Sequence, residues 1–131
     1  MRVAYLAGPY RAPTENALWE NIMEARRIAV ELWKLGYAVI CPHTNTAFFG
    51  LGADHDHIFL DGDLEIISRL DPKCDCMVMM PKWRDSVGAC GEREVAMKCG
   101  LTSYEWPHVP PAVNVVVVGS EPPEQPEGAG A

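Results

Sequence analysis

The chain has 131 residues, of which 48% are hydrophobic, and this length suffices for one hydrophobic core but not for two. Its formal net charge of −7 argues against a polymeric nucleic acid as partner, because an acidic surface repels a polyanion. The sequence contains no apolar run long enough to span a membrane, and its N-terminus lacks the pattern of a secretory signal. We therefore expect a cytoplasmic protein with no membrane partner.

The first elements are a strand and a long helix. Residues 3–7 form a short apolar run that ends at Gly8 and Pro9, which predicts a buried strand followed by a tight loop. Residues 16–35 carry one apolar stripe at helical spacing, and Gly36 provides the expected stop.

The middle of the chain continues the alternation. Residues 37–41 predict a second strand, and the long loop expected over residues 43–56 has a length typical of functional loops. The helix that follows reaches Leu70. Its expected apolar face is made up of Leu60, Leu64 and Ile67.

Two further strands and one helix complete the pattern. We predict a strand over residues 76–80, a helix over residues 88–99 closed by Gly100, and a short strand over residues 102–106. Alternating strands and helices indicate an α/β fold: a small open parallel sheet with helices on both faces, a flavodoxin- or Rossmann-like three-layer arrangement.

The C-terminal part differs in composition from the rest. Residues 1–106 are predicted to form one domain, and prolines separate them from an extension over residues 107–118. The apolar stretch 113–118 in this extension is interpreted as an edge strand or a subunit contact. Residues 119–131 are rich in Pro, Glu and Gly and are expected to be disordered.

Metal sites are not expected. The five cysteines are an odd number without a secretory context, so we expect reduced thiols, and Cys74 and Cys76 are too close in sequence for a typical zinc pair. Residues 54–57 alternate carboxylates and imidazoles. Neighbouring loop residues rarely converge on one ion unaided, so a solvated lid is the preferred interpretation.

The loops after the strands are the expected ligand site. In an open parallel sheet, ligands bind beyond the carboxyl ends of the strands, and residues 8–11, 42–44 and 81–88 lie there. The last of these leads to Glu92, which we expect in the opening turn of a helix, where the dipole and free N–H groups favour its ionised form. An ionised carboxylate at this edge suits a glycosidic nucleophile. The alternative is that Glu92 is only a helix-start acid.

A set of residues spread over the predicted strands and loops forms one pattern: Tyr5, Gly8, Pro42-His43, Asp63, Pro81-x-Trp83 and Ser86-x-Gly88-Ala89-x-x-Glu92-x-x-x-Ala96-x-x-x-Gly100. With this pattern the chain resembles, over residues 3–105, the nucleoside 2-deoxyribosyltransferase-like superfamily. It is most similar to a small branch common in phages and bacteria, often left as a domain of unknown function, with the 2′-deoxynucleoside 5′-phosphate N-hydrolases as characterised relatives.

The resemblance implies roles for four of these residues. Glu92 matches the nucleophile, Asp63 the aspartate that assists proton transfer at the base, and Tyr5 the tyrosine that orients the nucleophile. Ser86 matches a position that is aspartate in the transferases and serine in the nucleotide hydrolases, where it helps to hold the 5′-phosphate. This difference favours a monophosphate as substrate.

The remaining site residues are expected to contact the substrate. In the hydrolases that the chain resembles, backbone N–H groups of the loop after the first strand point at the phosphate. Pro9 has no N–H to offer at this place, so Arg11 is expected to supply the positive charge that binds the phosphate. His43 is interpreted as a sugar or phosphate contact or as a plain loop residue, and Trp83 as a base-stacking platform or as loop packing. The predicted substrate-binding set is Gly8, Pro9, Arg11, His43, Trp83, Ser86 and Gly88.

The resulting functional hypothesis is hydrolysis of the base–sugar bond of a (deoxy)nucleoside 5′-monophosphate through a covalent glycosyl ester on Glu92. This chemistry requires neither a metal nor an organic cofactor. Three alternatives stay open: a deoxyribosyltransferase that exchanges bases, a nucleotide-binding protein without turnover, and cleavage of a dinucleotide, for which no Gly-rich fingerprint is present. The resemblance also implies a homodimer or a higher homo-oligomer.

Overall fold

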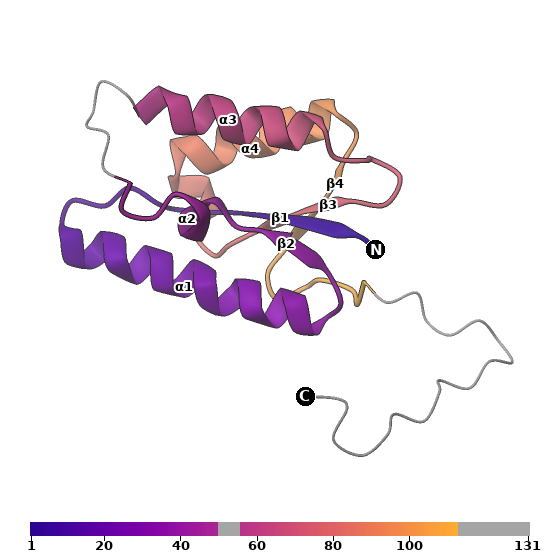
Figure 1. The fold of residues 1–131 in the computed structure, drawn as a ribbon, viewed down its shortest axis with the longest axis horizontal. Coiled ribbons are helices and arrows are strands. Elements are labelled where there is room, and N and C mark those ends of the chain that lie inside the picture. The colour runs from indigo at the N-terminus through magenta and orange to yellow at the C-terminus, as the bar shows by residue number, and fades with distance from the viewer. Residues whose placement is uncertain (50–55, 113–131) are drawn as a thin grey trace, which may run out of the picture.

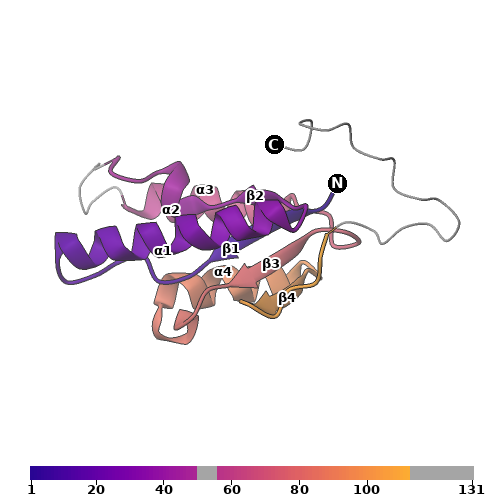
Figure 2. The same ribbon diagram turned by 90° about the horizontal axis from the view of Figure 1, so that it is seen from below.

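The computed structural model describes residues 1–49 and 56–112. It has the predicted α/β fold, with one open sheet of four parallel strands in the order β2-β1-β3-β4. The strands are β1 (Val3–Ala7), β2 (Ala38–Ile40), β3 (Cys76–Met79) and β4 (Thr102–Glu105). Helix α1 (Glu15–Lys34) covers one face of the sheet, and α3 (Asp56–Ser68) and α4 (Val87–Lys98) cover the other (Figures 1 and 2).

The strand order creates a switch point between β1 and β3. The chain leaves β1 through α1 to reach β2 on one side, and later crosses to β3 on the other side of β1. The connections that leave the carboxyl ends of β1 and β3 therefore run toward opposite faces of the sheet. In open α/β sheets this divergence opens the crevice in which ligands bind.

The central strands β1 and β3 are buried on both faces, which is why they appear in the sequence as nearly continuous apolar runs. In β1, Ala4 and Leu6 pack into the core on the α1 side, whereas Tyr5 and Ala7 pack into the core on the side of α3 and α4. The alternation of the strand thus directs the Tyr5 side chain toward α4.

Helix α1 begins and ends close to its predicted limits. The Thr14 hydroxyl caps its start by accepting the Ala17 N–H at 3.1 Å, and Gly36 follows its end with a φ of 98°. The predicted stripe is confirmed, with Leu18 half-buried at its beginning. Its fully buried residues are Ile22, Ala25, Ile28, Ala29 and Leu32.

Two local expectations were wrong. The segment expected to be a loop from residue 43 begins instead with a short helix, α2 (Pro42–Asn45), because Pro42 at its first position has a backbone φ already suited to a helix. In α3, Ile67 is buried but Leu60 is 41% exposed. Leu60 lies near the start of α3, at the carboxyl edge of the sheet (Figure 1), where there is less sheet surface to cover it.

The chain returns to α1 after β4. The Tyr37 hydroxyl donates to the Pro110 carbonyl at 2.7 Å, and the Ala112 N–H donates to the Leu35 carbonyl at 3.0 Å. The predictions for residues 54–55, 113–118 and 119–131 fall outside the described residues. Within residues 1–49 and 56–112, no helix combines the length and apolar character needed to cross a membrane.

Candidate active site

A hydrogen bond between two buried side chains forms the centre of the candidate site. The Tyr5 hydroxyl, from β1, donates to Oε2 of Glu92, from α4. Tyr5 is fully buried and Glu92 is 8% exposed. Burial, the neighbouring Glu92 charge and the hydrogen bond to it raise the pKa of Tyr5, so its hydroxyl stays protonated and acts as a permanent donor to the carboxylate.

Glu92 lies one turn later in its helix than the sequence suggested. Ser86 caps α4 and Val87 is its first residue, so the first turn contains no acidic residue and Glu92 is in the second. The expectation that free N–H groups favour the ionised form of Glu92 was therefore wrong, because these groups belong to the first turn. Burial dominates instead and raises the pKa of Glu92 to about 7, opposed by the Tyr5 hydrogen bond and reinforced by the charge of Asp63.

Asp63 is the second carboxylate of the site. It projects from α3, which packs alongside α4 (Figure 1), and it is half-buried. Burial raises its pKa to about 6. Its charge also contributes to the raised pKa values of Glu92 and Tyr5, so the three groups interact electrostatically. Tyr5, Asp63 and Glu92, all expected from the sequence to share a site, are thus brought together.

The two carboxylates form a coupled pair with one proton near neutral pH. Asp63 loses its proton first, because it is less buried than Glu92, and its charge then opposes the ionisation of Glu92. Between pH values of about 6 and 7 the pair therefore holds a single proton. A pair in this state can supply one acid and one base or nucleophile.

His43 anchors the loop after β1. It is 4% exposed, its Nε2 lies 2.8 Å from the Pro9 carbonyl oxygen, and its ring contacts the edge of Tyr10 with centroids 5.5 Å apart. Since a carbonyl only accepts, Nε2 must carry the proton, and burial lowers the pKa of His43 so that the ring stays neutral. Nothing in the described part of the chain hydrogen-bonds to its Nδ1.

Gly8 and Pro9 bring this loop against β3. A Cβ atom on Gly8 would lie 2.5 Å from Cβ and Sδ of Met80, so only glycine fits at this close approach. Pro9 is half-buried and Arg11 is exposed. Both lie at the carboxyl end of β1, as expected, on the segment that connects β1 to α1.

Ser86 and Gly88 form the start of α4, at the carboxyl side of β3. The Ser86 Oγ accepts the Ala89 N–H at 3.1 Å, which leaves its own hydroxyl proton available for donation. Gly88 is exposed, and a Cβ there would meet only the Ser86 Oγ, at 4.0 Å. Packing therefore does not require glycine at this position, and its lack of a side chain keeps the helix start open.

Trp83 has the contacts of a packing residue, one of the two roles considered for it. It is 9% exposed, and its indole N–H donates to Oε1 of Glu105 at 2.9 Å. The guanidinium carbons of Arg84 and Arg93 lie 4.5 and 5.0 Å from its ring centroid. Stacking of Trp83 on a base stays a prediction.

Sequence reasoning missed two residues that shape the site. The Asn21 side chain, on α1, donates to the Tyr10 carbonyl at 3.0 Å and fixes the loop that His43 also holds. Tyr10 itself packs on His43. A polar residue on the otherwise apolar inner side of α1 was the only available signal for Asn21, and the sequence held none for Tyr10.

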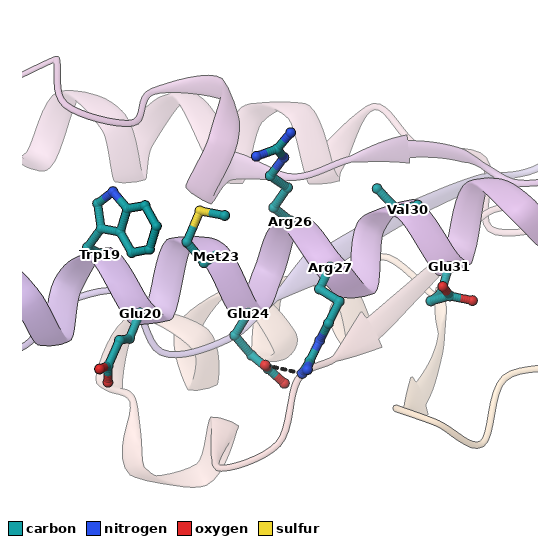
Figure 3. A pocket seen from close by; sticks show the side chains of 8 residues that line it. All are labelled: Trp19, Glu20, Met23, Glu24, Arg26, Arg27, Val30 and Glu31. Atoms are coloured by element: carbon teal, nitrogen blue, oxygen red, sulfur yellow. Dashed lines mark hydrogen bonds and ion pairs between the residues drawn. The ribbon is translucent and has the colours of Figure 1, made fainter.

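One surface hollow lies away from these residues. It has a volume of about 670 Å³, runs along α1, and among the described residues is lined by side chains of that helix (Figure 3). It is on the opposite side of the sheet from α3 and α4, which carry the two carboxyl groups of raised pKa, so we place the candidate site at Glu92 and Asp63. Over the residues that the structure describes, no three His, Cys, Asp or Glu side chains group as metal ligands.

The arrangement defines an α/β protein in which a buried and a half-buried carboxyl group, Glu92 and Asp63, interact beside the central strand β1. Residues 2–104 match the model of a domain of unknown function, DUF4406, and the chain belongs to this family. A search of curated proteins finds none that matches.

A solved structure has a similar fold. It is that of a 2-deoxyribosyltransferase from the psychrotolerant bacterium Bacillus psychrosaccharolyticus, with a TM-score of 0.52 and 21% sequence identity. The similarity covers 79% of this chain and 70% of that chain. At this identity the likeness establishes the fold and agrees with the resemblance noted from the sequence.

Proposed function

We propose that the protein is an N-glycosidase that hydrolyses the base–sugar bond of a (deoxy)nucleoside 5′-monophosphate. The observation that carries the proposal is the buried hydrogen bond from Tyr5 to Glu92, with Asp63 near enough for its charge to raise the pKa of Glu92. A buried carboxylate held by a neutral donor is suited to attack an anomeric carbon, and a second carboxyl group of raised pKa is suited to protonate a leaving base. The similar fold of a deoxyribosyltransferase supports the same class of chemistry.

In the first step, C1′ loses its bond to the base nitrogen and gains a bond to the Glu92 carboxylate. Glu92 attacks C1′ as the C1′–N bond breaks, and Asp63 passes its proton to the departing base nitrogen. In the second step the Asp63 carboxylate takes a proton from water while the water oxygen attacks C1′ and releases Glu92. Both steps invert C1′, so the overall reaction retains its configuration.

The reactive form requires the shared proton on Asp63, whereas the free protein holds it mainly on Glu92. Burial raises the pKa of Glu92 more than that of Asp63, so moving the proton to Asp63 costs free energy. Asp63 is half-buried and Glu92 is already covered. A base bound over Asp63 would exclude water from that carboxyl group and raise its pKa further, which favours the reactive form.

Recognition of a 5′-phosphate is proposed for the start of α4 and the loop after β1. The open helix start at Gly88, the free proton of the Ser86 hydroxyl and the cationic side chain of Arg11 all lie at the carboxyl edge of the sheet. Helix N-termini favour anions, which supports a phosphate at α4.

A panel of nucleosides and their 5′-monophosphates, assayed for release of free base, tests the proposal. We expect release from at least one monophosphate, at a higher kcat/KM than from the matching nucleoside. A protein that binds a nucleotide of the panel but releases no base from any would be a binding protein rather than an enzyme.

Transfer is the second candidate function, since the similar solved structure is that of a transferase. Incubating the best substrate with a second free base separates the two reactions. A new nucleotide containing the second base would establish transfer, and unchanged hydrolysis would exclude it.

The pH dependence of kcat/KM is expected to be bell-shaped. Below a pH of about 6 both carboxyl groups are protonated and the nucleophile is lost, and above about 7 both are ionised and the acid is lost. The maximum is therefore expected near pH 6.5, and steady-state assays across pH 4.5 to 9 locate it. A flat profile over this range would contradict the shared-proton mechanism.

Tyr5→Phe is expected to lower kcat/KM at pH 7 by about 10- to 100-fold, because a hydrogen bond to the ionised nucleophile is lost. Since that bond lowers the pKa of Glu92, the alkaline limb of the pH profile should also move to higher pH. Tyr37→Phe is the matched control: it removes a hydroxyl that bonds to Pro110, away from the carboxylates. An unchanged alkaline limb in Tyr5→Phe would mean that Tyr5 serves packing alone.

A further inference from the structure

The start of α3 carries one ring of an aromatic pair at the carboxyl edge of the sheet (Figure 1). Phe59, in the first turn of α3, is half-buried, and Phe49, which precedes this helix in the chain, is 59% exposed. Their rings meet edge to face, with centroids 6.2 Å apart and planes inclined at 62°. Aromatic surface left open to solvent beside a polar site is available to the apolar part of a ligand.

The helical spacing places Phe59 on the same face of α3 as Asp63. Phe59, Asp63 and Ile67 follow one another at steps of four residues, and residues at this spacing share one face of a helix. Ile67 belongs to the core cluster that contains Tyr5, and the charge of Asp63 acts on Glu92. This face of α3 is therefore directed at the candidate site, with Phe59 about 6 Å from Asp63 along the helix axis.

The proposed reaction places the base beside Asp63. Because Asp63 protonates a nitrogen of the leaving base, the base must lie within hydrogen-bond distance of this carboxyl group. The ring of the base then extends along the face of α3. The turn after Asp63 is closed, since Ile67 is fully buried, whereas the turn before it leads to Phe59 and the open edge of the sheet. The space for the ring is therefore on the side of Phe59.

Two other aromatic side chains at this edge are less suited to hold the base. Trp83 is 9% exposed, and the guanidinium groups of two arginines already lie against its ring. Tyr10 packs on His43 in the loop after β1, where the 5′-phosphate is proposed to bind. The phosphate and the base are attached to different carbons of the sugar, so the loop after β1 and helix α3 would hold opposite ends of the nucleotide.

We propose that Phe59, packed against Phe49, forms the surface on which the leaving base lies and is a specificity-determining residue of this site. The inference rests on the proposed function, which sets the position of the base. Neither phenyl ring has a hydrogen-bonding group, so Phe59 contributes through ring contact alone. This contribution grows with the apolar area covered, so a bicyclic base gains more from Phe59 than a monocyclic base.

Binding to the Glu92→Gln variant, in which no turnover is expected, tests the proposal. The ligands are the 2′-deoxynucleoside 5′-monophosphates of the four DNA bases and, as a ligand without a base, 2-deoxyribose 5-phosphate. Adding Phe59→Leu, which keeps apolar bulk on α3, should weaken the binding of the purine nucleotides by about tenfold and of the pyrimidine nucleotides by about threefold. Affinity for the sugar phosphate should change by less than about twofold, because that ligand does not reach Phe59. Calorimetry measures all of these affinities.

Two further variants control for general effects on α3. Phe59→Tyr keeps the aromatic ring and should bind every ligand like the parent. Ile58→Ala removes apolar bulk from the neighbouring position, which is 46% exposed and lies about 100° around the helix from Phe59. It should change no affinity by more than about a factor of two.

The outcomes separate this inference from the proposed function. Equal losses for nucleotides and sugar phosphate in Phe59→Leu, or no loss for either, would overturn the role of Phe59 even if the wild type releases base. A loss confined to the nucleotides, in a protein whose wild type releases no base, would refute the hydrolase and support the base-binding surface. A protein that binds none of the nucleotides would contradict both.

Discussion

Replacing Glu92 with glutamine is expected to abolish base release, with a loss of at least about 10⁴-fold in kcat, because an amide cannot form the glycosyl ester. The substitution preserves shape, and the amide oxygen can still accept the Tyr5 hydroxyl. Nucleotide binding, measured by calorimetry, should therefore stay within a few-fold of the wild type. Free-base release quantified by chromatography gives the rate.

Glu94→Gln is the control for this substitution. Glu94 lies on the same helix, but it is exposed and pairs with Lys98 at 3.3 Å on the surface. Its replacement should leave kcat within a factor of about two, since a surface ion pair contributes little. Activity of Glu92→Gln comparable with that of Glu94→Gln would rule out Glu92 as the nucleophile.

The stability of Glu92→Gln provides a second readout that does not require substrate. Burial raises the pKa of Glu92 from 4.5 to about 7, so the folded protein holds this proton more tightly than the unfolded chain. The free energy of unfolding then falls as pH rises from about 4.5 through 7. At pH 8 the glutamine variant should be more stable than the wild type by about 3 kcal/mol, and at pH 4 the two should match. Urea denaturation at both pH values measures this difference.

Replacing Asp63 with asparagine should give a loss that depends on the leaving base. For an ordinary base, which must be protonated to leave, kcat/KM is expected to fall by about 10³-fold. For the N-methylated, cationic form of the same base, which leaves without a proton, the fall should be less than about tenfold. The parameter kcat/KM is the right measure, because it excludes the later step in which Asp63 activates water.

Asp61→Asn controls for the general effect of removing a charge from α3. Asp61 is exposed and two residues before Asp63. The Asp61→Asn substitution should change kcat/KM for either substrate by no more than about a factor of two, because exposed charges contribute little. If Asp63→Asn lowered kcat/KM equally for the ordinary and the N-methylated base, Asp63 would not be the acid.

The fold could be predicted because its signals are local. The central strands β1 and β3 are buried on both faces and appear as apolar runs, and Gly36 and Gly100 have the positive φ values that end α1 and α4. Leu60 was misplaced because helical periodicity does not reveal where the sheet beneath a helix stops. The helix at Pro42 was missed because its single turn has no apolar period.

The residues of the site could be predicted, but not their protonation. Glu92 was proposed from its place after the third predicted strand and from the resemblance, and Tyr5 and Asp63 from the resemblance alone. The ionisation of Glu92 was misjudged because burial outweighs the helix dipole, and burial arises from the packing of α3 on α4. The spacing of residues along the sequence does not show how α3 packs on α4, so it does not show that Glu92 is buried.

The configuration of the product tests the glycosyl ester on Glu92 most directly. Carried out in aqueous methanol, the reaction should give a methyl glycoside of the sugar phosphate, whose anomers do not interconvert and are distinguished by proton NMR. Two displacements at C1′ should yield the β anomer, the configuration of the starting nucleotide. The α anomer would show a single displacement by solvent and would contradict a covalent role for Glu92.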